Sequence, residues 1–291
     1  MQRSSIGFVV SATLLLGLGL VPTACAGALP DFMEHWEVGW NIDEDEAPSF
    51  FLDPILPLAR QSTGARALFV EPRVNFSNRE ALVNLGGGYR QVVLDRSWLL
   101  GANMFYDYDS MNSHYRLGWG LEALSAYAEW RANAYLGLSS KRLVEERGGV
   151  SIFEKAVDGY DVEIGTPIPY YSRVKLFGGF NWYNYEKFKN RYGWTLRTEY
   201  KPLPFLVVDG LVSDDTKSNV DWGLTVAVKI PLGANAATLA RSPLALDPQM
   251  FPESDVTNRL WSLVERHHDV VVERYSETAP GRINVEVRRG T

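Results

Sequence analysis

The sequence has almost no cysteine and little histidine. Cys25 is its only cysteine, and the four histidines are His35, His114, His267 and His268. Because Cys25 lies in a stretch that we expect to be removed, the mature chain has no thiol for disulfides, thiolate catalysis or redox chemistry. The fold must therefore hold together without covalent cross-links.

Long apolar runs are also lacking, except at the N-terminus. The chain opens with Arg3, continues with an apolar stretch from Ile6 to Val21, and then reads Ala24-Cys25-Ala26. A basic start, a short apolar core and an A-x-A site are typical of a cleaved secretory signal, which we place at residues 1–26. Pro22 stands where a lipoprotein signal has a leucine-like residue, so we favour simple cleavage over lipidation. No later stretch offers about 18 consecutive apolar residues, which excludes a transmembrane helix from the mature chain.

Positive charge is not in excess either. The formal net charge is −6, whereas proteins that bind nucleic acids usually carry a basic face. We therefore expect no nucleic-acid partner. Any membrane role of the mature chain must come from strands.

Segments that alternate between apolar and polar residues recur along most of the chain, and successive strand side chains point to opposite faces. Many of these segments are ten to thirteen residues long. Strands of soluble proteins usually run ~5–6 residues, whereas a tilted strand that spans a membrane needs ~9–11. The sequence thus predicts an all-β protein, a transmembrane antiparallel β-barrel. The predicted strands lie near 33–41, 65–75, 81–93, 97–107, 114–124, 127–139, 158–167, 173–184, 191–201, 205–213 and 220–231.

The two faces of these strands differ in chemistry. One face carries charges of both signs and small residues, which suit a wet lumen, and the other is apolar and aromatic, which suits hydrocarbon. We predict as lumen-facing Arg116, Gly118, Gly120, Glu122, Glu129, Arg131, Asn133, Asp161, Glu163, Arg197 and Glu199. We predict as lipid-facing Tyr115, Leu117, Trp119, Leu121, Trp130, Leu136, Trp194 and Trp222. A secreted β-sandwich or soluble barrel with the pattern inside out is the alternative, and alternation alone does not separate the two. Strand length, the signal peptide and the aromatic content favour the membrane barrel.

Connections between the predicted strands alternate in length. Asp95-Arg96 and Ser125-Ala126 are tight, whereas 141–157 and 42–64 are long. Bacterial single-chain barrels have even strand numbers, so the eleven predicted strands imply ten or twelve. We expect the error within the first hundred residues, where several prolines obscure the pattern.

The last part of the chain differs in composition and lacks the alternation of the predicted strands. Residues 234–253 are rich in Ala and Pro and predict a linker, and 255–267 has Leu260, Leu263, Val264 and His267 at helical spacing. Ser254 or Asp255 could cap this helix. A hairpin is predicted beyond it, with its turn at 279–281. The expected organisation is a signal peptide at 1–26, an N-terminal segment with a first strand at 27–64, a barrel at 65–233 and a linker and tail at 234–291.

Residues that could carry chemistry are few. His114 has Asp107 and Asp109 across its hairpin, but a turn histidine is usually a solvated residue, and no Gly-x-Ser-x-Gly turn is present. The acidic run 43–46 lacks the spacing of a calcium loop, and the neighbouring His267 and His268 do not converge on a zinc ion. Glycines 86–88 lie inside a strand pattern and form no phosphate loop. We predict no enzyme activity, no cofactor and no metal site.

A set of ordered motifs resembles the β-domain of inverse autotransporters, the intimin and invasin family. The motifs include 103–109 (NMFYDYD), 114–122 (HYRLGWGLE), 131–135 (RANAY), 159–161 (GYD) with Pro167 and Pro169, 199–204 (EYKPLP) and 263–273 (LVERHHDVVVE). The resemblance covers about residues 60–275. It implies a twelve-stranded outer-membrane barrel whose C-terminal segment passes through the pore and displays a passenger, which in that family is an adhesive rod of immunoglobulin-like domains.

The chain departs from that pattern in two ways. No rod follows before Thr291, and there is no room for the peptidoglycan-binding module that some members carry before the barrel. The expected partners are outer-membrane lipid, and the barrel-assembly machinery and periplasmic chaperones during insertion; a host or cell-surface ligand is unknown. If a segment crosses the lumen, we expect it to pass Gly118, Gly120 and glycines 86–88. A tail left in the periplasm, and a passive or tail-plugged pore without surface display, are the alternatives.

Overall fold

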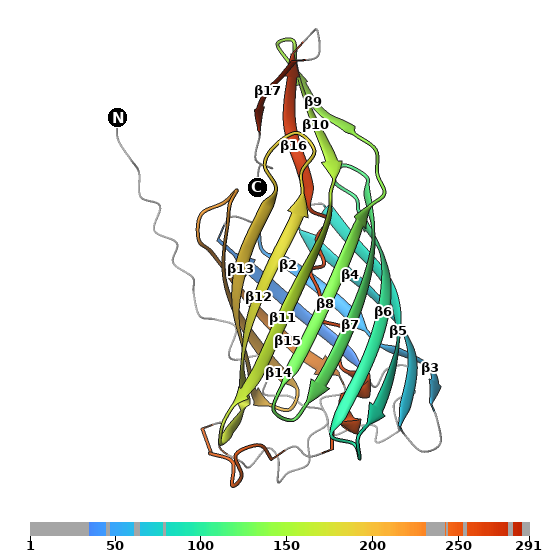
Figure 1. Ribbon diagram of the computed structural model, residues 1–291, viewed down its shortest axis with the longest axis vertical. Helices are drawn as coiled ribbons and strands as arrows, with labels where there is room; N and C mark the ends of the chain where they lie inside the picture. The colour runs from blue at the N-terminus through green and yellow to red at the C-terminus, as the bar shows by residue number, and fades with distance from the viewer. Residues whose placement is uncertain are drawn as a thin grey trace, which may run out of the picture.

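A closed barrel of twelve antiparallel strands dominates the computed structural model (Figure 1). The structure describes residues 35–44, 47–60, 65–77, 80–230, 242, 244–252, 255–278 and 282–286. The predicted signal peptide and half of the predicted linker lie outside these ranges. The barrel strands are β1 (Trp36–Asp43), β2 (Ser49–Pro54), β4 (Arg66–Ser77), β5 (Glu80–Val93), β6 (Trp98–Asp109), β7 (His114–Ser125), β8 (Glu129–Gly137), β11 (Asp158–Ile168), β12 (Tyr171–Asn184), β13 (Arg191–Leu203), β14 (Leu206–Asp215) and β15 (Asp221–Ile230).

The barrel closes between its N-terminal strands. β1 pairs with the last barrel strand, β15, while β2 pairs with β1 on one side and with β4 on the other. The short β3 (Leu56–Arg60) continues along β4 where β2 ends, so β2 and β3 together occupy one strand position. The all-β barrel and its even strand number confirm the prediction from the sequence.

The strand that the sequence analysis missed is β2 with β3. We expected a long connection at 42–64 and a barrel that begins at residue 65, whereas the barrel already takes in residues 36–60. Pro54 ends β2 and Pro57 lies within β3, and proline removes the backbone N–H that a strand ladder uses. The interruption split one strand into two pieces too short to recognise by alternation.

The two ends of the barrel differ in their connections. At one end, which we call the short-turn end, the strands are joined by residues 94–97, 126–128, 169–170 and 204–205. At the other, the long-loop end, the connections include 138–157, 185–190 and 216–220. β1 begins and β15 ends at the short-turn end, because antiparallel strands of even number return to their starting side.

A second, four-stranded sheet stands above the long-loop end (Figure 1). Two of its strands, β9 (Arg142–Arg147) and β10 (Val150–Ala156), form a hairpin within the long 138–157 connection. The other two, β16 (Val272–Thr278) and β17 (Arg282–Glu286), form the hairpin that we predicted in the tail, and β16 pairs with β10. The sheet therefore joins a barrel loop to the C-terminal part of the chain.

The predicted helix at 255–267 is wrong. Only a single 3-10 helix, η2 (Thr257–Trp261), forms there, and the backbone turns extended at Ser262. The reason is tertiary, since barrel arginines bind the carbonyl groups that a longer helix would use internally, as described below. Within the described ranges no helix is both long enough and apolar enough to cross a membrane.

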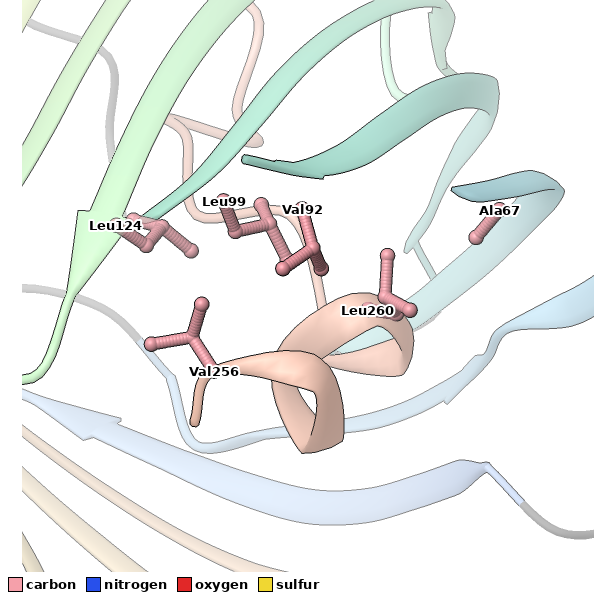
Figure 2. Packing of buried hydrophobic residues seen from close by; sticks show 6 residues of the cluster. All are labelled: Ala67, Val92, Leu99, Leu124, Val256 and Leu260. Atoms are coloured by element: carbon pink, nitrogen blue, oxygen red, sulfur yellow. The ribbon is translucent and has the colours of Figure 1, made fainter. Parts of the chain in front are cut away.

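The largest apolar cluster of the interior lies at the short-turn end. Val256, just before η2, and Leu260, within it, pack against barrel side chains from β4 to β7 (Figure 2). The barrel members of the cluster are Ala67, Val92, Leu99 and Leu124. Burial of apolar surface favours this arrangement by about 25 cal/mol per Å², so η2 is fixed inside the end of the barrel.

Barrel closure can be tested at Asp53 of β2, which lies beside Arg73 of β4 at 2.8 Å with both side chains nearly excluded from solvent. The Asp53→Ala change should lower the free energy of unfolding by about 3–5 kcal/mol, because it leaves a buried guanidinium without its counter-charge. Urea unfolding of the refolded barrel, followed by gel mobility before and after heating, measures the loss.

The matched control is Asp255→Ala, which removes an aspartate that pairs with Arg96 at 3.1 Å on the exposed surface. Exposed pairs contribute little, so the unfolding midpoint should stay near that of the parent protein. Equal midpoints for the two variants would contradict the importance of the Asp53–Arg73 pair.

Candidate functional site in the barrel lumen

Residues 255–271, which we call the luminal segment, run through the barrel from the short-turn end to the long-loop end (Figure 1). At the short-turn end, the Val256 amide donates to the Arg96 carbonyl at 3.0 Å. Halfway, Val264 packs with Phe69 and Phe105 of the barrel wall. At the long-loop end, the Val157 amide donates to the Val271 carbonyl at 3.1 Å. The segment thus spans the lumen between the two ends.

Asp107 of β6 is the centre of the contacts between wall and segment. Arg116 of β7 lies directly across from it in the ladder and donates from Nε to its Oδ2 at 2.7 Å. Arg266 of the luminal segment donates to both carboxylate oxygens, at 2.7 and 2.6 Å. All three side chains are at most 1 % exposed. One buried carboxylate therefore joins a cation of the wall to a cation of the segment, and paired geometry of this kind is what makes buried charge tolerable.

Two wall arginines bind the backbone of the segment. Arg116 donates to the carbonyls of residues 267, 268 and 269 at 2.7, 3.0 and 2.6 Å. Arg90 binds Glu122 through Nε at 2.5 Å and donates to the carbonyls of residues 260, 262 and 263. A buried carbonyl without a partner is costly, and these bonds satisfy carbonyls of the segment that accept no hydrogen bond from a helix of its own.

Further wall groups meet the remaining polar atoms of the backbone. Glu71 accepts from the Val264 amide at 3.2 Å, and Asn84 donates to the His268 carbonyl at 3.1 Å. The Tyr135 hydroxyl accepts from the His267 amide at 3.0 Å and donates to Asp161 at 2.5 Å. The lumen wall is therefore complementary to a defined register of the segment.

Gly118 makes room for the segment, as the sequence analysis expected. A Cβ at this position would lie 2.8 Å from Arg266 Nη2. The other glycines named in advance meet other parts of the barrel instead. Gly86 lies under the ring of Phe105, Gly88 under that of Phe69, and Gly120 beside two asparagines, whereas Gly87 lies against the backbone of β4. The Phe69 and Phe105 rings in turn pack against Val264, so Gly86 and Gly88 act on the segment through them.

A network of ion pairs links the segment to β8, β11, β12 and β13. Glu129 accepts from Arg259 of η2 at 2.5 Å and from Lys175 at 2.7 Å, and it also pairs with Arg131. Arg197 binds Glu163 at 2.8 Å and lies 3.6 Å from Glu265 of the segment. Charges of both signs alternate through this network, so no large excess of one sign is buried.

The structure places the residues that we predicted as lumen-facing within these contacts. Arg116, Glu122, Glu129, Arg131, Asn133 and Glu199 are buried, and Asp161, Glu163 and Arg197 are half-buried. Of the residues predicted as lipid-facing, Trp119, Leu121, Trp130, Leu136, Trp194 and Trp222 are exposed, and Tyr115 and Leu117 are half-buried. The sequence analysis did not name Glu71, Asn84 or Arg90, although all three are polar residues inside predicted strands.

Glu273 of β16 holds the segment at the long-loop end. Its carboxylate accepts from three successive amides of the β12–β13 loop, those of residues 186, 187 and 188, at 3.0, 2.8 and 3.0 Å. The side chain is fully buried. Together with the β10–β16 ladder, this contact fixes β16 between two loops of the barrel.

His114 is not the solvated turn residue that we expected. It is fully buried, with Nδ1 2.8 Å from the Ser139 hydroxyl and Nε2 3.3 Å from Glu154 of β10. The Ser139 hydroxyl is itself buried. The cluster thus fastens the β9–β10 hairpin to the rim of the barrel. In the described part of the chain no three His, Cys, Asp or Glu side chains are grouped to hold a metal ion.

A barrel of twelve long strands with an apolar outer face and a charged, occupied lumen belongs to the class of outer-membrane β-barrels. A family model described as "Inverse autotransporter, beta-domain" matches residues 22–268. The chain belongs to this family, and it is a barrel of the Gram-negative outer membrane.

Curated relatives agree with this assignment, and a solved structure agrees with the fold. Invasin of Yersinia enterocolitica is 24% identical over 265 residues, which cover 83% of this chain and 30% of the relative. Inverse autotransporter adhesin YeeJ of Escherichia coli K12 is 22% identical over 284 residues, or 88% of this chain and 11% of the relative. The chain thus spans less than a third of either relative. A solved structure reported as "Unveiling the Mechanism Behind the in-meso Crystallization of Membrane Proteins" superposes with a TM-score of 0.66 at 18% identity, over 82% of this chain and 99% of that one.

The fit of the segment to the wall can be tested at Gly118. The Gly118→Leu change should expel the luminal segment, because the new side chain needs the space of the Arg266 guanidinium. Trypsin should then cut the folded barrel after Arg259 and Arg266, which mass spectrometry detects, whereas the parent protein resists.

The matched control is Gly178→Leu, since a Cβ on this strand glycine would meet nothing within 4 Å. It should leave the segment protected. Cleavage of both variants at the same rate would show that leucine in a strand, and not the loss of space in the lumen, causes the effect.

Proposed function

We propose that this barrel anchors its own C-terminal segment in the outer membrane and carries it from the periplasm through the lumen to the cell surface. The observation that carries the proposal is the binding of Asp107 to both Arg116 of the wall and Arg266 of the segment. A loose periplasmic tail would have no need of a buried binding site in the lumen wall.

The direction of passage follows from the connections. Outer-membrane barrels have short periplasmic turns and longer extracellular loops, which assigns the short-turn end to the periplasm. β15 ends on that side, and the luminal segment leaves at the other. The β10–β16 ladder and the Glu273 contact then lie outside the membrane, where they would stop the chain from sliding back.

The proposed partners of the barrel are lipid and the proteins that insert it. We propose that the exposed apolar residues, among them Trp119, Leu121 and Trp194, face lipid, and that the buried charges face the lumen. Insertion would use the barrel-assembly machinery and periplasmic chaperones. The relatives named as an invasin and an adhesin favour a role in adhesion, for which the ligand is unknown. The proposed role is mechanical and not catalytic, which the burial of the Ser139 hydroxyl beside His114 supports.

Passage through the pore can be tested with an epitope tag after Thr291. On intact cells, antibody and added protease should reach the tag, because the segment leaves the lumen at the extracellular end. A periplasmic marker protein must stay hidden in the same cells. A tag that becomes accessible only after the outer membrane is broken would contradict export.

A second candidate function, a partly plugged pore, is favoured by one feature of the lumen. A cavity of about 270 Å³ lies between the luminal segment and the wall formed by β11 to β14. Arg191, Arg197, Asp161 and Asp215 contribute to its lining. A cavity of this size with charged groups in its lining can hold water, so a narrow ion path beside the segment is the alternative to a closed plug.

Single-channel recording in planar bilayers separates the two candidates. If the segment closes the barrel, the parent protein should show little steady current, and Gly118→Leu should open a conductance many times larger by expelling it. A large steady current through the parent protein, unchanged by the Gly118→Leu change, would favour the pore.

A further inference from the structure

Residues 244–252 expose apolar side chains on the surface of the molecule. Leu244, Leu246 and Met250 are 78%, 70% and 46% exposed. The side chain of Asp247, the one charged residue of this stretch, is buried. Burial of these exposed leucines against an apolar partner would be favourable, because apolar surface is then removed from water.

The stretch is held in place against the short-turn end of the barrel. Asp247 accepts from the amide and the hydroxyl of Ser172 at 2.7 and 2.6 Å. Its own amide donates to the Tyr170 carbonyl at 2.7 Å, and the Tyr170 amide donates to the Met250 carbonyl at 3.0 Å. These bonds fasten the stretch to the turn between β11 and β12, so the leucines are presented by a fixed backbone.

Aromatic contacts continue from the outer face of the barrel onto the stretch. Trp98 of β6 packs edge-on against Tyr127 at 5.7 Å between ring centroids, and Tyr127 lies 6.3 Å from Phe251. Tyr127 and Tyr170 are both about half exposed. Aromatic residues in such positions form the girdle that marks the membrane–water interface of outer-membrane barrels, and Phe251 extends this girdle away from the strands.

We propose that residues 244–252 form an interfacial strap, which inserts Leu244, Leu246 and Met250 into the periplasmic leaflet of the outer membrane. The stretch contains no lysine or arginine, so its binding comes from apolar burial and does not need anionic lipid. Four residues separate the strap from η2, and the strap thereby holds the chain at the periplasmic mouth where the luminal segment begins. This inference rests on the proposed function, in which the exposed apolar residues of the barrel wall face lipid. We call these residues the lipid-facing belt.

Lipid-borne quenching tests the strap in the full chain, reconstituted into nanodiscs of zwitterionic phospholipid. Cys25 is the only cysteine, so with Cys25→Ser a single label can be placed by Leu246→Cys. A polarity-sensitive fluorophore there should be quenched several-fold by phospholipid with brominated acyl chains. Leu196→Cys on the outer face of β13 is the positive control, and Leu143→Cys on the β9 hairpin is the negative control; both leucines are exposed.

The outcomes distinguish the strap from the belt. Quenching at 246 and 196 but not at 143 supports the strap. Quenching at 196 alone overturns the strap and leaves the proposed function intact, whereas no quenching at 196 overturns the lipid-facing belt itself. A disulfide-linked dimer of unlabelled Leu246→Cys would show that a second copy covers the leucines, which also overturns the strap. Adding Asp247→Ala should reduce quenching at 246, and heat-shifted gel mobility confirms that each variant is folded.

Discussion

The buried carboxylate of Asp107 is the interaction on which the arrangement of the lumen depends. It holds Arg116 of the wall and Arg266 of the segment together, and Arg116 then donates to three consecutive carbonyls of the segment. Each of these charges would be strongly unfavourable inside the barrel alone. The wall and the segment therefore neutralise each other, and neither has a satisfied interior without the other.

This mutual dependence explains the irregular shape of the segment. In a helical stretch the backbone carbonyls bond within the helix, and the N–H groups of Arg90 and Arg116 that do not bind Glu122 and Asp107 would lack acceptors. The extended backbone beyond Ser262 offers its carbonyls to them. Apolar packing of the segment lies in three places, around Leu260 at the short-turn end, Val264 halfway along and Val271 at the long-loop end. The segment is bound mainly by directed hydrogen bonds, which fix its register, and register decides which residues emerge to pair with β10.

Much of the barrel could be predicted from the sequence, because strands that separate two media alternate strictly. The alternation around Arg116 and Trp119 located β7. In the structure, its even-numbered residues from 114 to 124 are buried, and its odd-numbered residues from 115 to 123 are half-buried or exposed. The β2–β3 position could not be found, since Pro54 and Pro57 interrupt the pattern. The helix at 255–267 was predicted from real periodicity at Leu260, Leu263 and Val264, but the competing acceptors lie on distant strands. Likewise, the residues around His114 in the sequence do not predict that it is buried beside Glu154, which lies forty positions further along the chain.

The sequence by itself determined the fold class, the length and parity of the strands, the family and the tail hairpin, because these follow from local periodicity and ordered motifs. Only the tertiary structure decided how the barrel closes at β2 and β4, that the segment is extended, and which groups bind it. Those features depend on side chains far apart in the chain, such as Asp107 and Arg266, whose pairing exists only once the barrel has brought them together.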